Sequence, residues 1–211
     1  MREFEKFPLP VDKAPAFAVR GIYKDDFGCK IKGDVFMTLR DGKTGEIQEH
    51  REIKNLVVLD ASILIARLLR APSEPHFGIY ALSIGTGGPY WDKQSPPAPT
   101  VTQRALVSEI ARKTFTSVQF IDASGVPTAT ATHITDYTCT FAESEASGPL
   151  VEMGLISPLS SNMSIKNPVP VGPYDPTVDL SSYDTLCNYL TFAVLNKPAT
   201  STLTITWRLT F

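Results

Sequence analysis

The sequence is poor in histidine and cysteine, two residue types that often bind transition metals or take part in catalysis. Its 211 residues include only three histidines and three cysteines. Cys29, Cys139 and Cys187 are far apart, odd in number and outside any C-x-x-C pattern. This spacing fits neither a zinc site nor a disulfide framework. We interpret the three as small apolar residues in a reducing compartment, and whether any of them bonds to another subunit stays open.

Long apolar runs and an excess of basic charge are also missing. Lys and Arg number 20 and Asp and Glu number 22, which gives a formal net charge of -2. Binding to nucleic acid without regard to sequence needs a strong basic surface, so this function is not expected. No stretch approaches the roughly 20 apolar residues of a membrane-spanning helix. The first residues, MREFEKFPLPVDKAP, contain no hydrophobic core of a secretion signal, so none is expected.

The glycine-rich stretch LSIGTGGPYWD (residues 82–92) lacks the features of a phosphate-binding loop. It matches neither G-x-x-x-x-G-K-[ST] nor G-x-G-x-x-G, and Pro89 follows its last glycine. The next residues have the composition of a loop, so no helix N-terminus is available to receive a phosphate. The stretch therefore predicts a turn at the end of a strand, where glycine tolerates positive φ. No cofactor is expected.

Patterns for catalysis or metal binding are equally sparse. No histidine belongs to an H-E-x-x-H pattern, and the chain has no G-x-S-x-G elbow. Two glutamates two positions apart fit a turn better than a glycosidase pair, and three aspartates near the N-terminus do not follow an EF-hand spacing. We therefore expect no metal site and no enzymatic activity. The residues considered were His50, His76, His133, Glu143, Glu145, Asp25, Asp26 and Asp34.

The sequence does contain several segments with the residue patterns of β-strands. The stretch TLTITWRLTF (202–211) alternates apolar residues with Thr and Arg, which predicts a strand with Leu203, Ile205, Trp207, Leu209 and Phe211 on one face. LVEMGLIS (150–157) predicts another strand, ended by a proline. Three hairpins are predicted from strand pairs around turn residues. They join KGDVFMTLRD to GEIQEHREIKN (with Val35, Met37 and Leu39 on one face), FTSVQFID (115–122) to TATATHITDYTCTFAE (128–143), and CNYLTFAVLN (187–196) to the last strand.

One segment has helical rather than strand spacing. Residues 55–71, NLVVLDASILIARLLRA, predict a helix over about 56–70 that Asn55 or Asp60 caps and Pro72 ends. The apolar stripe is wide, so the helix is expected to be well buried against a sheet. Val57 and Val58 also fit the end of a strand, which leaves the start of the helix open. The stripe consists of Leu56, Leu59, Ile63, Leu64, Ile65, Leu68 and Leu69.

Together these patterns predict a mainly β protein, an antiparallel β-sandwich with one packed α-helix. Two segments do not fit a compact sandwich. Residues 1–28 have little periodicity and predict an extended N-terminal arm in front of a sandwich domain at 29–211. Residues 158–186 carry five prolines and predict a long insertion loop, which is usually functional or disordered.

The order of these elements resembles small β-sandwich virion proteins of tailed bacteriophages. It runs from MTLRDGKTGEIQEHREIKNLVV through a glycine-threonine-glycine turn, RALVSEIARKTFTSV and LVEMGLIS to TLTITWRLTF. The resemblance covers about residues 33–157 and 187–211. It implies a structural role in the neck or collar, the baseplate or a tail-fibre anchor, with the neck slightly preferred. It also implies a chain made in the host cytoplasm that forms homo-oligomers and docks onto other virion proteins.

Aromatic residues in the arm and loops are the candidates for these contacts. We expect the arm and the insertion loop to gain affinity by ordering on contact with neighbouring chains. The alternative is a baseplate or tail-fibre module in which open aromatic rings stack on a host surface glycan. Exposure of the rings in the assembled state separates the two hypotheses. The candidate residues are Phe4, Phe7, Phe17, Tyr90, Trp91, Tyr174 and Tyr183.

Overall fold

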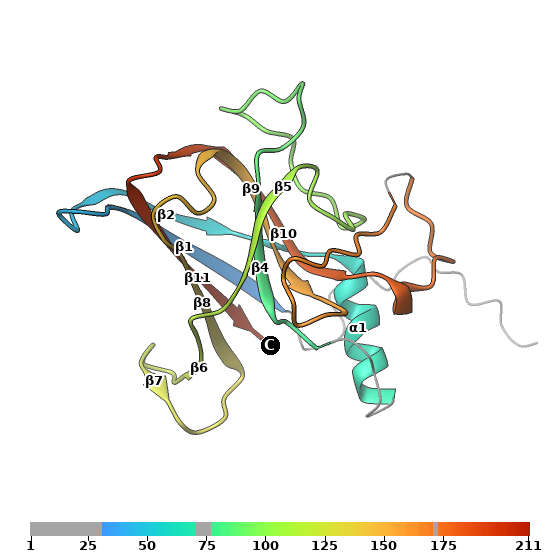
Figure 1. Cartoon of the computed structure of the whole chain (residues 1–211). Coiled ribbons are helices and arrows are strands. Elements are labelled where there is room, and N and C mark those ends of the chain that lie inside the picture. The colour runs from blue at the N-terminus through green and yellow to red at the C-terminus, as the bar shows by residue number, and fades with distance from the viewer. Residues whose placement is uncertain (1–30, 71–76, 171–172) are drawn as a thin grey trace, which may run out of the picture. The chain divides into compact units, whose positions relative to one another are not determined.

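The secondary structure of the described part of the chain consists of two antiparallel sheets, one α-helix and a short 3-10 helix, Leu180–Ser182 (Figure 1). The computed structural model describes residues 31–70, 77–170 and 173–211. The predicted mainly β fold, a sandwich with a single helix, is confirmed for these residues. The proposed N-terminal arm with Phe4, Phe7 and Phe17 lies outside them, as do Cys29 and His76.

Among the described residues, one sheet has six strands and the other has five, and every strand pairing is antiparallel. The larger sheet has the order β2-β1-β11-β8-β6-β7. Its strands are β1 Lys32–Asp41, β2 Ile47–Lys54, β6 Ser117–Ile121, β7 Pro127–Thr128, β8 Ile134–Phe141 and β11 Ser201–Thr210. The smaller sheet has the order β3-β10-β9-β4-β5. Its strands are β3 Leu56–Val57, β4 Ala81–Gly85, β5 Glu109–Thr114, β9 Gly148–Ser157 and β10 Thr185–Lys197.

The alternating strands form the core as their pattern predicts. β1 and β11 pair so that Val35 lies opposite Trp207 and Leu39 lies opposite Leu203, and all four side chains are buried. Burying a side chain of this size contributes about 1.5–3 kcal/mol. Phe211 departs from the prediction because β11 ends one residue earlier, and its ring is exposed instead of lying in the core.

Two of the three predicted hairpins differ in the structure. The turn after β6 leads into the short strand β7, and β8 then pairs with the opposite edge of β6. The predicted long strand at 128–143 is therefore split. β10 and β11 do not pair at all, since they belong to different sheets. Pro198 cannot donate to a ladder, and the linker carbonyls of Ala199 and Thr200 instead accept from Ser144 and Gly42. The first hairpin, β1 with β2, is confirmed.

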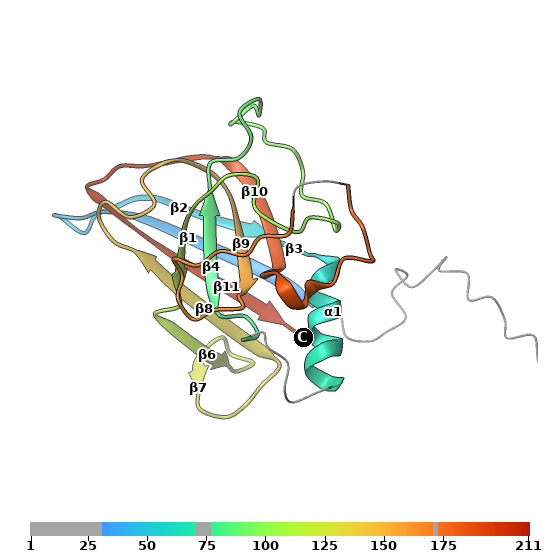
Figure 2. The same ribbon diagram turned by 45° about the vertical axis from the view of Figure 1, so that its right-hand side comes forward.

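The helix α1 spans Leu59–Arg70 and closes one end of the sandwich (Figure 2). Leu56 and Val57 form β3 against β10, so the helix starts three residues later than the first of its predicted bounds. The expectation of a well-buried helix is wrong for four of the seven residues of the apolar stripe. α1 packs on β10 rather than across a whole sheet face, so few of its side chains can be covered. Ala61 and Leu64 are buried, whereas Ile63, Ile65, Leu68 and Leu69 are exposed.

Candidate functional site

Two long connections meet over the outer face of the five-stranded sheet. Residues 86–108 join β4 to β5, and residues 158–184 join β9 to β10. Leu106 from the first connection packs on Ile156, Leu186 and Tyr189, which form an apolar cluster separate from the core between the sheets. The two connections enclose a pocket of about 260 Å³. Its walls include Arg104, Leu106, Val107, Val169, Tyr174 and Tyr183.

A buried carboxylate from β9 holds the first connection in place. Glu152 is fully buried and accepts four hydrogen bonds. Its Oε1 accepts from the amides of Gly87 (3.1 Å) and Ser108 (2.7 Å). Its Oε2 accepts from the amide of Val107 (2.9 Å) and from the hydroxyl of Tyr189 (2.7 Å). Burial and the adjacent carboxylate raise the pKa of Tyr189, so its hydroxyl stays a donor. One side chain thus ties both ends of this connection to the sheet.

The glycine-rich stretch is a turn, as predicted, and no helix follows it. Gly87 has φ +67°, and a Cβ there would come within 2.4 Å of the Trp91 ring. A Cβ on Gly88 would also meet this ring, at 2.8 Å. Glycine is therefore required so that Trp91 can pack on its own turn. Tyr90, by contrast, is 98% exposed.

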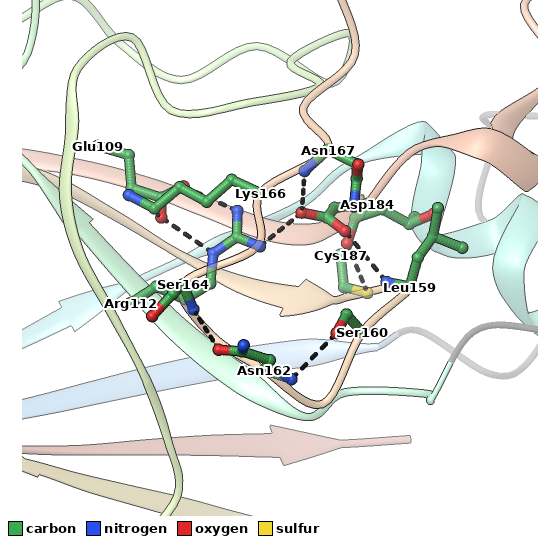
Figure 3. A network of polar contacts seen from close by, with 11 residues as sticks. Glu109, Arg112, Leu159, Ser160, Asn162, Ser164, Lys166, Asn167, Asp184 and Cys187 are labelled. Atoms are coloured by element: carbon green, nitrogen blue, oxygen red, sulfur yellow. Dashed lines mark hydrogen bonds and ion pairs between the residues drawn. The ribbon is translucent and has the colours of Figure 1, made fainter.

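The second connection is anchored by Asp184, a buried residue just before β10 (Figure 3). Its carboxylate accepts from the amide of Leu159 at 3.1 Å, from the amide of Asn167 at 3.0 Å and from Arg112 at 2.5 Å. Burial favours the neutral acid, but the bonds from Arg112 and the two amides outweigh this effect and lower the pKa of Asp184. The start, middle and end of the connection therefore converge on one charge.

The Arg112 guanidinium completes this network from β5. Its Nε and its second terminal nitrogen each lie 2.9 Å from an oxygen of Glu109. Lys166, in the second connection, reaches the same glutamate at 3.0 Å. The insertion loop is thus anchored within the chain at several points, and its contact with neighbouring chains stays a prediction.

Arg104 is one of the residues that line the pocket. Its guanidinium lies 4.4 Å from the centre of the Tyr174 ring, a cation–π distance. It also bonds the main-chain oxygen of Asp175 at 2.7 Å and pairs with Asp60 on α1 at 3.1 Å. Burial raises the pKa of Asp60, although Arg104 opposes the shift. One face of the Tyr174 ring and the charge of Arg104 are consequently already engaged within the chain.

Of the predicted contact residues, the structure brings Tyr174 and Tyr183 together at this pocket. Tyr90 and Trp91 lie just after the glycine turn of the first connection, which Glu152 ties to β9. Glu152, Arg112 and Asp184 were not predicted from the sequence. Apart from the Glu109 contact, their partners are 17–72 residues away in sequence, so no local spacing marks them.

Among the residues weighed for catalysis or metal binding, His50 and Glu145 have structural partners, whereas Asp25, Asp26 and His76 lie outside the described residues. His50 lies on β2, with Nδ1 2.9 Å from the hydroxyl of Thr38. Glu145 accepts from the amide of Ala142 at 2.8 Å and from Lys113, as expected for an acid that bounds a turn. Within residues 31–70, 77–170 and 173–211, no three His, Cys, Asp or Glu side chains gather where they could hold a metal ion. No helix in this part of the chain is long and apolar enough to span a membrane.

Comparison with known proteins identifies one matching family. The family model of the baseplate wedge 3 tail fiber network component matches residues 70–146, about a third of the chain. The matched segment runs from the end of α1 through the glycine turn and the pocket residues of the first connection. It ends in the turn after β8. No curated protein matches the chain. The match supports the resemblance to virion proteins of tailed bacteriophages and indicates a structural protein of the phage baseplate and tail.

Proposed function

We propose that this chain is a non-enzymatic structural component of the phage baseplate that docks onto a neighbouring tail protein. The docking site is the loop surface, defined as residues 102–107 and 173–178 with Tyr183. The observation that carries the proposal is the anchored pocket between the two connections, which the matched segment and the insertion loop build together. The neck location expected from the sequence has no support in the match, which favours the baseplate.

The chemistry of the loop surface suits a protein partner. Its polar groups are engaged, since Arg104 bonds Asp60 and Asp175, and the Gln103 amide donates to the oxygen of Ala105 at 2.6 Å. The remaining walls are mainly valine, proline, leucine and tyrosine. Preorganised aromatic and aliphatic groups around a pocket are typical of the centre of a protein interface.

The glycan alternative has less support. Stacking on a sugar requires open ring faces. Trp91 packs on Gly87 and Gly88, and Arg104 covers one face of Tyr174. Tyr90 alone among the four described candidates is almost fully open, and one ring makes a small platform.

Location and docking can be tested separately. Immunogold labelling of virions should place the chain at the baseplate, and labelling of the neck or head would contradict that placement. For docking, phage lacking the gene should be complemented with wild type, Tyr174→Ala or Phe120→Ala. Phe120 is a partly exposed ring on β6, away from the pocket, and serves as the matched control. We expect only Tyr174→Ala, shown by circular dichroism to be folded, to reduce incorporation into particles. Normal incorporation of Tyr174→Ala would refute the loop surface as the docking site.

A further inference from the structure

Arg104 joins three segments of the chain at the loop surface. It lies in the first connection, and its guanidinium pairs with Asp60, the second residue of α1, at 3.1 Å. The same group donates to the main-chain oxygen of Asp175 at 2.7 Å and lies against the Tyr174 ring, and both of these residues belong to the second connection. An arginine can make all three contacts at once, because its planar group carries five donors and also stacks on aromatic rings.

These contacts attach residues 173–178 to the rest of the domain. Hydrogen bonds from Thr177 and Val178 to Asp175 stay within the segment, so they shape it without fixing its place. Four of its six residues are exposed, and Tyr174 and Val178 are half-buried, so little apolar packing holds it. The bond at Asp175 and the stacked ring therefore supply much of its attachment.

Arg104 itself is almost fully covered. Its side chain is 10% exposed, and that of its partner Asp60 is 1% exposed. A protein bound at the loop surface would contact the open part of Tyr174 and the residues after it instead. An effect of position 104 on docking must consequently act through the placement of those residues. Holding a binding loop in its bound conformation strengthens association, because less entropy is lost on binding.

We propose that Arg104 is a positioning residue for docking. From the start of α1 it holds Tyr174 and residues 175–178 in the geometry that the partner recognises, and it does so without contact to the partner. This inference rests on the proposed docking at the loop surface and adds the residue that preorganises that surface.

The substitution Arg104→Lys tests this role while keeping the charge that Asp60 needs. A lysine ammonium is a compact charge without a flat face, so it can pair with Asp60 but cannot also hold Asp175 and stack on Tyr174. Circular dichroism and urea denaturation should show a folded variant nearly as stable as wild type. Hydrogen exchange over residues 174–178 should be faster than in wild type, with exchange across β9 unchanged.

Complementation of phage that lack the gene gives the docking readout. Arg104→Lys should reduce incorporation into particles at least about fivefold, measured by immunoblot of purified virions. The double variant with Tyr174→Ala should incorporate as well as Tyr174→Ala alone, because both changes act through the same loop. Arg40→Lys is the matched control and should incorporate like wild type. Arg40 on β1 donates to the main-chain oxygen of Gly45 at 3.1 Å, in a turn outside the loop surface.

Three results would overturn the inference. The first is normal incorporation of Arg104→Lys alongside reduced incorporation of Tyr174→Ala, which leaves the docking site in place. The second is a double variant in which the two losses multiply, since Arg104 would then act independently of the ring. The third is a strongly destabilised Arg104→Lys, which would assign the arginine to the support of the whole domain. Normal incorporation of Tyr174→Ala would instead remove the docking site, and the inference with it.

Discussion

Replacing Glu152 by glutamine should loosen the first connection and lower the stability of the whole domain. The carboxylate accepts three main-chain amides and one hydroxyl at 2.7–3.1 Å. In Glu152→Gln, the side-chain NH2 group replaces one of the two carboxylate oxygens. It therefore faces the donors that this oxygen binds in the wild type. The Tyr189 hydroxyl can turn to accept, but a main-chain N–H cannot, so at least one buried amide loses its acceptor.

The magnitude follows from this count. An unsatisfied buried donor costs about 1–3 kcal/mol, and bonds to a charged group are each stronger than neutral ones by about 1 kcal/mol. These effects do not add fully, and single substitutions rarely exceed about 4–5 kcal/mol. We expect Glu152→Gln to lower the free energy of unfolding by about 2–4 kcal/mol. Urea denaturation followed by circular dichroism measures this change.

Hydrogen exchange gives the local readout of the same substitution. The amides of Gly87, Val107 and Ser108 should exchange faster in the folded variant than in wild type, because their acceptor is weakened or lost. Glu52→Gln on β2 is the control, since Glu52 is exposed and should leave both stability and exchange at these amides unchanged. Unchanged protection of the three amides in Glu152→Gln would refute the anchoring role of the carboxylate.

Three further predictions concern the turns, the second anchor and the thiols. Gly87→Ala should destabilise more than Gly125→Ala in urea denaturation, because both have positive φ but only the former Cβ would strike a neighbouring ring, an overpacking cost of about 1–3 kcal/mol. Asp184→Asn should be less stable than wild type at neutral pH, with the difference shrinking below about pH 4, since a lowered pKa stabilises the fold only while the acid is ionised. Burial raises the pKa of Cys139 and Cys187 to about 12, so peptide mapping should find both modified by Ellman's reagent only after unfolding.

Strands were predictable from the sequence where one face is buried and the other is exposed to solvent. β1 and β11 alternate residue by residue, so their core faces follow directly from the period of two. β10 was recognised as a strand but assigned the wrong neighbour. The first half of β10 is buried on both faces, between the inter-sheet core and the apolar cluster around Leu106. Its apolar pattern therefore does not indicate which strand it pairs with.

The apolar stripe of α1 shows a different limit. Helical spacing gives the width of the stripe correctly, yet it does not say what covers it. Leu64 meets the core, whereas Leu69 on the same stripe meets none of it. A helix at a protein interface would also have an apolar stripe wider than the part that packs on its own core. The sequence alone does not distinguish side chains that pack on the core from side chains that face a partner.

The residues that anchor the loop surface could not be predicted from local sequence patterns, because they join segments that are distant in sequence. Arg112 belongs to the segment matched by the baseplate family model, whereas Asp184 and Tyr174 lie in the insertion outside it. The ion pair between Arg112 and Asp184 therefore fastens an unmatched loop to a matched framework. If the loop surface docks a tail partner, a change in residues 173–178 can alter the choice of partner while Arg112 keeps the loop in place. Loss of Asp184 should instead weaken docking to any partner, because it releases the loop itself.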